Sequence, residues 1–155
     1  DVCSSDLMDA YQIQAEAQGA QLDNYRFADY GVPTVSTSIF ASETYLKDNA
    51  EVVKKFVAAS LKGWSFAIDN PEKSVKDLKA VFPEMDEKLA TAELAAIGPL
   101  FCSGGAKFLG KAEDAHWTRS QQLLAEVKLL PDGQDPKSYY THAYLPPESQ
   151  MRVCK

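Results

Sequence analysis

The side chains with the clearest binding chemistry gather in two short stretches near the start of the chain. Carboxylates, amides, hydroxyls and aromatic rings can hydrogen-bond and stack, which suits recognition of a small polar or heterocyclic molecule. The first stretch holds Asp9, Tyr11, Gln12 and Gln14, and the second, around a Gly/Pro break, holds Asp29, Tyr30, Ser36, Thr37 and Ser38. We predict that these residues bind a ligand.

Each half of this prediction has a simpler structural alternative. Asp9 can cap a helix and Tyr11 can pack against neighbouring side chains, with no ligand involved. The three consecutive hydroxyls that begin at Ser36 can be solvated groups on an ordinary edge strand. Both alternatives stay open from the sequence.

No pattern in the chain indicates catalysis or a metal site. His116 and His142 are the only histidines, and neither has a partner at metal-ligand spacing, so we expect solvated surface roles for both. The G-x-S-x-G, H-E-x-x-H and G-x-G-x-x-G motifs are absent, and residues 103–105 lack the phosphate-binding pattern. We therefore predict that the protein is not an enzyme and uses no cofactor and no metal.

The cysteines give no strong signal. Cys102 and Cys154 show no C-x-x-C spacing, which argues against a zinc site or a thiol-redox motif. They can pair in an oxidising compartment, but the chain terminus around Cys154 can fray, so we expect two independent thiols.

The elements predicted to carry the polar residues alternate between strand and helix. Residues 7–11 end a strand, residues 12–20 form a short helix, and residues 25–28 and 35–41 form strands on either side of the break. This alternation is typical of a parallel α/β sheet, where ligands bind beyond the carboxyl ends of the strands. The polar residues would then lie at that edge.

The rest of the chain is predicted to be mostly helical. Apolar residues at helical spacing place Val53, Phe56, Val57 and Trp64 on one buried stripe. Ser42 caps a short turn, Asn70 caps the next helix with Pro71 at its first position, and Asp86 begins another helix. The predicted longer helices span residues 49–68, 70–82, 86–97 and 113–129.

The composition limits the possible partners. The chain has 155 residues, of which 45% are hydrophobic and 25% charged, and it contains no apolar run of the ~20 residues needed to span a bilayer. A net charge of -6 argues against a nucleic-acid partner, because neutralising phosphates needs a Lys/Arg surface. We predict no nucleic-acid partner and no direct membrane insertion.

The first seven residues look foreign to the rest. Residues 1–7 resemble the translation of a sequencing-adapter end, and the following residues begin abruptly inside an element. We expect residues 1–7 to be such an artefact; a genuine flexible terminus is the alternative.

Several motifs occur in an order that is similar to one known family. They are Met8-Asp9-Ala10, Ala28-Asp29-Tyr30-Gly31-Val32-Pro33, Asn49-Ala50-Glu51, Lys62-Gly63-Trp64 followed by Asn70-Pro71-Glu72, Trp117, and Tyr140-Thr141-x-x-Tyr144-Leu145-Pro146. Together they resemble the periplasmic substrate-binding proteins of the thiamine-precursor, nitrate, sulfonate and taurine-binding family. The resemblance matches only the C-terminal portion of such a protein.

The resemblance implies a fold and a place in transport. The expected fold is α/β, a truncated type II periplasmic-binding-protein architecture that is helix-rich with a small mixed or parallel sheet. Residues 8–33 would end the second lobe, residues 34–147 would form the C-terminal part of the first lobe, and residues 148–155 would be a tail. The expected partners are a small-molecule ligand and the permease of an ABC-type importer.

The resemblance also implies a location and leaves one alternative. It implies a periplasmic or extracytoplasmic protein that is a monomer when complete and takes up a pyrimidine thiamine precursor, a sulfonate or a similar nutrient. The proposed cluster contains no Arg or Lys, which disfavours a strongly anionic ligand. The alternative is a pyrimidine-precursor synthase, although the cysteine-rich motif of those enzymes is absent here.

Overall fold

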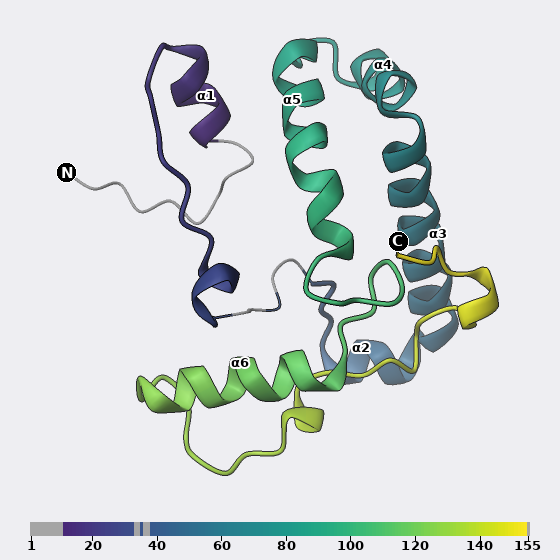
Figure 1. Ribbon diagram of the computed structural model, residues 1–155. Helices are drawn as coiled ribbons and strands as arrows, with labels where there is room; N and C mark the ends of the chain where they lie inside the picture. The colour runs from purple at the N-terminus through teal and green to yellow at the C-terminus, as the bar shows by residue number, and fades with distance from the viewer. Residues whose placement is uncertain (1–10, 33–34, 36–37, 155) are drawn as a thin grey trace. The chain divides into compact units, whose positions relative to one another are not determined.

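The computed structural model describes residues 11–32, 35 and 38–154 (Figure 1). The chain divides into two compact units, each made of two separate stretches. The first unit comprises residues 1–24 and 62–103, and the second comprises residues 25–61 and 104–155. Helix α3 (Ala50–Asp69) contributes its first twelve residues, 50–61, to the second unit and the rest to the first.

The first unit is built around α5 (Glu87–Ile97). This helix contacts α1 (Tyr11–Ala17), α4 (Pro71–Val81) and the 3-10 helix η2 (Gly98–Cys102). Val75 of α4 is buried, and the Trp64 ring packs on Phe101 with centroids 4.5 Å apart. The short helices are therefore held by packing against one another.

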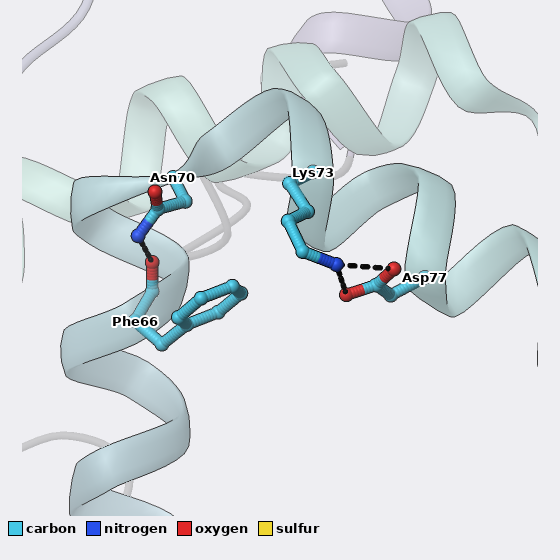
Figure 2. Close-up of polar contacts among 4 residues, drawn as sticks. All are labelled: Phe66, Asn70, Lys73 and Asp77. Carbon is cyan, nitrogen blue, oxygen red and sulfur yellow. Dashed lines mark hydrogen bonds and ion pairs between the residues drawn. The ribbon is translucent and has the colours of Figure 1, made fainter.

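The junction between α3 and α4 is set by short-range contacts (Figure 2). Pro71 occupies the first turn of α4, where a missing N–H costs nothing, as predicted. The Asn70 side chain does not cap α4 but donates to the Phe66 carbonyl at 3.1 Å, at the end of α3. Lys73 pairs with Asp77 one turn later at 2.8 Å. The turn between the helices is thereby fixed from the α3 side.

The second unit contains α2 (Glu43–Asp48), the first part of α3, and α6 (Asp114–Glu126). Three short 3-10 helices complete it, η1 (Phe27–Tyr30), η3 (Pro136–Ser138) and η4 (Glu148–Gln150). Its buried apolar side chains are Val53, Val57, Leu109 and Met151. Leu109 is only 1% exposed and marks the centre of this core.

The sheet that we predicted is wrong for the described residues, where no strand forms. Residues 27–30 are a 3-10 helix, Tyr11 begins α1, and residues 35 and 38–41 pair with no neighbouring strand. Local bonds replace the ladder: Asp29 N–H donates to the Arg26 carbonyl and Val32 N–H to the Phe27 carbonyl, both at 3.0 Å. Residues with strand propensity form turns when no neighbour supplies ladder bonds.

The helix predictions are confirmed with small changes at the ends. Ser42 Oγ accepts from the Tyr45 N–H at 3.2 Å, so the predicted cap is present. The last predicted helix ends at Glu126 instead of residue 129, because Lys128 adopts φ 60°. That left-handed residue allows Leu129 N–H to bond back to the Leu124 carbonyl at 2.8 Å, which closes the helix.

Two predictions about packing and one about cysteines are wrong. Phe56 and Trp64 were expected in the core but are 59% and 39% exposed. Cys102 and Cys154 are not independent thiols, because both are disulfide-bonded. Tertiary packing, which decides both properties, cannot be inferred from residue spacing along a helix.

The helices also bear on membrane insertion. Among residues 11–32, 35 and 38–154, no helix combines the length and apolar character needed to cross a bilayer.

Candidate ligand-binding site

Three of the predicted site residues lie on α1 in the first unit. Tyr11 and Gln14 are exposed and three residues apart, so they share one face of the helix. The Gln12 amide donates to the Glu16 carboxylate at 2.7 Å and is already engaged within the helix. Asp9 lies outside the described residues. Tyr11 and Gln14 therefore carry the ligand-binding prediction for this helix.

The second group lies on the η1 turn of the second unit. The Arg26 guanidinium donates two parallel hydrogen bonds to the Asp29 carboxylate, from Nε to Oδ2 and from Nη2 to Oδ1, each 3.0 Å long. This fork geometry gives the turn a fixed shape, although both side chains are about half exposed. The Asp29 carboxylate is thus committed to its neighbour and serves to hold the turn.

The same turn presents two tyrosine rings. Tyr25 and Tyr30 have centroids 6.3 Å apart at an interplanar angle of 43°, and they are 72% and 68% exposed. Gly31 follows at φ 77°, a left-handed conformation that ends the 3-10 helix and favours glycine. Two exposed rings on a braced turn can stack against a planar ligand.

Helix α6 positions the chain that follows this turn. Arg119 Nη2 donates to the Gly31 carbonyl at 3.5 Å, and the next residue, Ser120, accepts from the Val35 N–H at 3.4 Å. Ser36 and Thr37 lie outside the described residues, whereas Ser38 is exposed. The structure therefore brings Asp29 and Tyr30 together with Arg119, and α6 holds both ends of the short segment after them.

Sequence reasoning missed the two arginines. The predicted cluster itself contains no Arg or Lys, but Arg26 and Arg119 both lie beside the turn. Arg26 stands three residues before Asp29, a spacing that predicts a local ion pair. Arg119 is 88 residues from Gly31, and no sequence signal joins them.

A second group of aromatic rings includes one on α6, and these rings pack against one another. The Trp117 ring stacks on Tyr140 with centroids 4.6 Å apart and 6° between the planes, and His142 tilts against Tyr140 at 5.4 Å. Burial raises the pKa of the Tyr140 hydroxyl, with a further contribution from its hydrogen bond to Asp114. His142 is therefore half-buried against a ring, instead of solvated as we expected.

Hollows elsewhere on the described surface do not involve this turn. An open hollow of about 380 Å³ lies on α6 and the turn after it, lined by Gln121, Gln122, Ala125, Glu126, Asp132 and Gly133. None of the predicted site residues lines it. The described part of the chain contains no group of three or more His, Cys, Asp or Glu side chains able to hold a metal ion.

The comparison with known proteins identifies the family that this chain resembles. A sequence model of the NMT1/THI5-like family matches residues 2–74. Riboflavin-binding protein RibY of Chloroflexus aurantiacus is 29% identical over 140 residues, which make up 86% of this chain and 39% of that protein. A formylaminopyrimidine-binding protein of Halalkalibacterium halodurans is 30% identical over 76 residues, 45% of this chain and 23% of that protein.

These matches confirm the resemblance inferred from the motifs. Both relatives are named as binding proteins. The aligned part of the chain spans about two fifths of the length of the first relative and under a quarter of the second. The η1 turn and its tyrosines fall within the part that the family model matches.

Proposed function

We propose that this chain is part of a substrate-binding protein of an ABC-type importer, and that its ligand is a small nitrogen-containing heterocycle. The observation that carries the proposal is the pair of exposed tyrosine rings on the braced η1 turn. A flat heteroaromatic ring offers a π face for stacking, which a sulfonate or nitrate lacks. The two relatives are named for riboflavin and formylaminopyrimidine, both of this chemical class.

The surroundings of the turn supply polar groups for the rest of the ligand. Arg119 reaches the Gly31 carbonyl only at 3.5 Å, and a guanidinium has five N–H donors, so it can also bond to a ligand carbonyl or phosphate. In this proposal Tyr25 and Tyr30 stack, Arg119 binds an acceptor, and Asp29 keeps the turn in shape. The predictions for Tyr11 and Gln14 in the first unit, and for Ser36, Thr37 and Ser38, rest on the sequence alone.

An extracytoplasmic location is part of the proposal. Disulfide bonds persist in oxidising compartments and are rare in the cytosol, and both Cys102 and Cys154 are disulfide-bonded. This supports the periplasmic placement implied by the family resemblance. A permease is then the partner that receives the ligand.

The test is isothermal titration calorimetry on the protein expressed from the complete reading frame that contains this chain. Riboflavin, formylaminopyrimidine, taurine and nitrate are each titrated into the protein. We expect one of the heterocycles to bind, and Tyr30→Ala to weaken that binding by roughly 10- to 100-fold, the range expected for a lost stacking contact.

A matched control separates stacking from folding. Tyr45→Ala removes another exposed tyrosine ring, on α2, and should leave the affinity within about twofold. Binding of taurine or nitrate alone would contradict the heterocycle proposal, and equal losses in the Tyr30 and Tyr45 variants would contradict the role of the turn.

A further inference from the structure

Helix α6 carries a polar side chain at a position where amphipathic helices usually place an apolar one. Gln121 lies one turn after Trp117 on the same face of the helix, and the Trp117 ring packs on Tyr140. Gln121 is only 9% exposed, and among the residues that the structure describes it is the single polar side chain buried to this degree. The fold of the second unit therefore encloses a side-chain amide almost completely.

The Gln121 amide has no hydrogen-bond partner in the described part of the chain. Within residues 11–32, 35 and 38–154, its side-chain nitrogen and oxygen bond to no other residue. Leaving a buried amide unpaired is costly, and nearly all buried polar groups in proteins have a partner. The unpaired amide therefore points to a partner from outside these residues.

A small molecule can reach this amide, because Gln121 lines a hollow. The hollow has a volume of about 380 Å³, which lies within the range typical of small-molecule sites. We call it the α6 hollow, and its lining residues are Gln121, Gln122, Ala125, Glu126, Asp132 and Gly133. Ser74 Oγ and Trp117 Nε1 are also buried without a partner, but neither residue lines this hollow.

The charges at the α6 hollow favour a cation. Glu126 and Asp132 are exposed carboxylates, and none of the six lining residues is a cation. Arg119 lies 3.5 Å from the Glu126 carboxylate and offsets only part of this negative charge. An ammonium group donates up to three hydrogen bonds, and both carboxylates and the Gln121 amide oxygen can accept them. An anionic ligand would be repelled by the same carboxylates.

An organic cation fits the α6 hollow better than a metal ion. The described part of the chain contains no group of three or more His, Cys, Asp or Glu side chains able to hold a metal. Gln121 and Ala125 lie four residues apart on α6 and therefore side by side, which places a methyl group next to the unpaired amide. The methylene groups of an alkyl chain can contact that methyl group.

We propose that the α6 hollow binds a small aliphatic ammonium ion. The Gln121 amide is its hydrogen-bonding partner, and Glu126 and Asp132 supply the opposite charge. The hollow shares no lining residue with the η1 turn, so this site does not depend on the heterocycle proposed above.

Titration calorimetry with 1,4-diaminobutane tests the proposal on the protein expressed from the complete reading frame. At pH 7 and low salt we expect a Kd of roughly 0.1–1 mM, weak because the hollow is open, and the affinity should fall as salt is added. The neutral 1,4-butanediol has the same carbon chain and should bind at least about tenfold more weakly. Absence of binding by the diamine, or equal affinity for the diol, would overturn the proposal.

Magnesium chloride separates a built site from simple attraction to negative charge. The magnesium ion carries the same charge as the doubly protonated diamine but has no alkyl chain. An equal concentration of magnesium should lower the apparent affinity for the diamine by less than about threefold. Complete displacement of the diamine by magnesium would contradict a site for organic ammonium ions.

Gln121→Leu tests the buried amide directly. Leucine has a similar size but cannot form hydrogen bonds, so the diamine should bind at least about tenfold more weakly. The melting temperature should fall by less than about 3 °C, because the amide loses no partner within the protein. Unchanged diamine affinity would contradict the proposal, and so would a much larger fall in melting temperature, since it would reveal an internal partner.

Two exposed carboxylates provide a matched pair of variants. Glu126→Gln removes a charge from the α6 hollow and should weaken diamine binding about 3- to 10-fold. Glu84→Gln makes the same change at an exposed position outside the hollow and should leave the affinity within about twofold. Equal losses in the two variants would contradict the proposal.

Tyr30→Ala distinguishes this site from the one on the η1 turn. The variant should leave diamine affinity within about twofold, whether or not it weakens binding of a heterocycle. A loss of diamine affinity in Tyr30→Ala equal to that in Gln121→Leu would place the ammonium ion at the turn and overturn the assignment to α6.

Discussion

At the scale of single residues, Gly110 shows two separate reasons for a glycine. Its φ of 79° lies in the left-handed region, and a Cβ built on it would lie 2.3 Å from Cδ2 of Leu61. Gly133 has a similar φ of 74°, but nothing lies within 4 Å of a Cβ there. A side chain at either position would therefore suffer the same backbone strain, but only at position 110 would its Cβ also clash with a neighbouring residue.

Gly110→Ala should accordingly destabilise the protein more than Gly133→Ala. We expect a loss of about 1 kcal/mol in the free energy of unfolding for Gly133→Ala from left-handed strain alone. For Gly110→Ala we expect a larger loss, about 2 kcal/mol, because the half-buried Leu61 side chain must also turn away from the new methyl group. Urea denaturation followed by circular dichroism measures both values.

A third variant isolates the steric part. Leu61→Ala removes the side chain that the new methyl would meet, so in that background Gly110→Ala should cost about as much as Gly133→Ala. Equal losses for the two glycine variants in the original background would show that the approach of Leu61 has no energetic effect.

At the scale of elements, the helix starts were predictable and the strands were not. The caps at Ser42 and Asp86 are made by atoms within three residues of the capping side chain, so the local sequence contains everything needed. A strand depends on a partner elsewhere in the chain, and residues 25–28, which have strand-forming side chains, instead lead into the η1 turn through local bonds. Burial of Phe56 and Trp64 depends on the same distant information.

The candidate site likewise has some features that the local sequence predicts and others that depend on distant parts of the chain. The sequence predicts Tyr30 and Asp29 as ligand contacts from local properties alone, namely side-chain type and position near a Gly/Pro break. The Arg26–Asp29 ion pair could also have been predicted from the sequence, because the two residues are three positions apart. The contacts of Arg119 and Ser120 with Gly31 and Val35 join residues more than 80 positions apart, and only the fold provides them.

Asp86 gives a prediction at this scale. Its Oδ1 accepts from the N–H groups of Lys88 and Leu89 at 2.8 and 3.0 Å, and these bonds hold the pKa of the carboxyl below its usual range. Asp86→Ala leaves two helix N–H groups without a side-chain acceptor, and we expect the melting temperature to fall by about 2–4 °C at pH 7. Differential scanning calorimetry measures the shift.

Asp86→Asn is the matched control and adds a pH dependence. Asparagine also caps helices but has no charge, so it should retain most of the stability at pH 7. A lowered pKa in the folded state means that the carboxylate stabilises the protein at neutral pH and that this contribution fades as the pH falls through the folded pKa. The melting-temperature gap between the original protein and Asp86→Asn should therefore shrink from about pH 5 downward. A gap that widens on acidification would contradict this assignment.

At the scale of the whole molecule, much of the apolar surface stays outside the two small cores. The described residues bury Val53, Val57, Val75, Leu109 and Met151, whereas Phe40 is 94% exposed and Tyr25, Val81 and Leu129 are each about 70% exposed. Soluble monomers rarely leave large apolar side chains exposed in such numbers. The relatives are more than twice as long as the part that aligns, so in them further chain is present that can cover such residues.

We therefore expect the 155-residue chain, on its own, to self-associate with rising concentration. The net charge of -6 opposes association by repulsion, so added salt should increase it by screening that charge. Phe40→Ser and Val81→Lys together remove two of the most exposed apolar side chains and should raise the monomer fraction, while Thr44→Ser, a polar change at an exposed position of α2, should not. Sedimentation velocity at several protein and salt concentrations measures the distribution. A single monomeric species under all conditions would show that the exposed side chains are too scattered to form an adhesive surface.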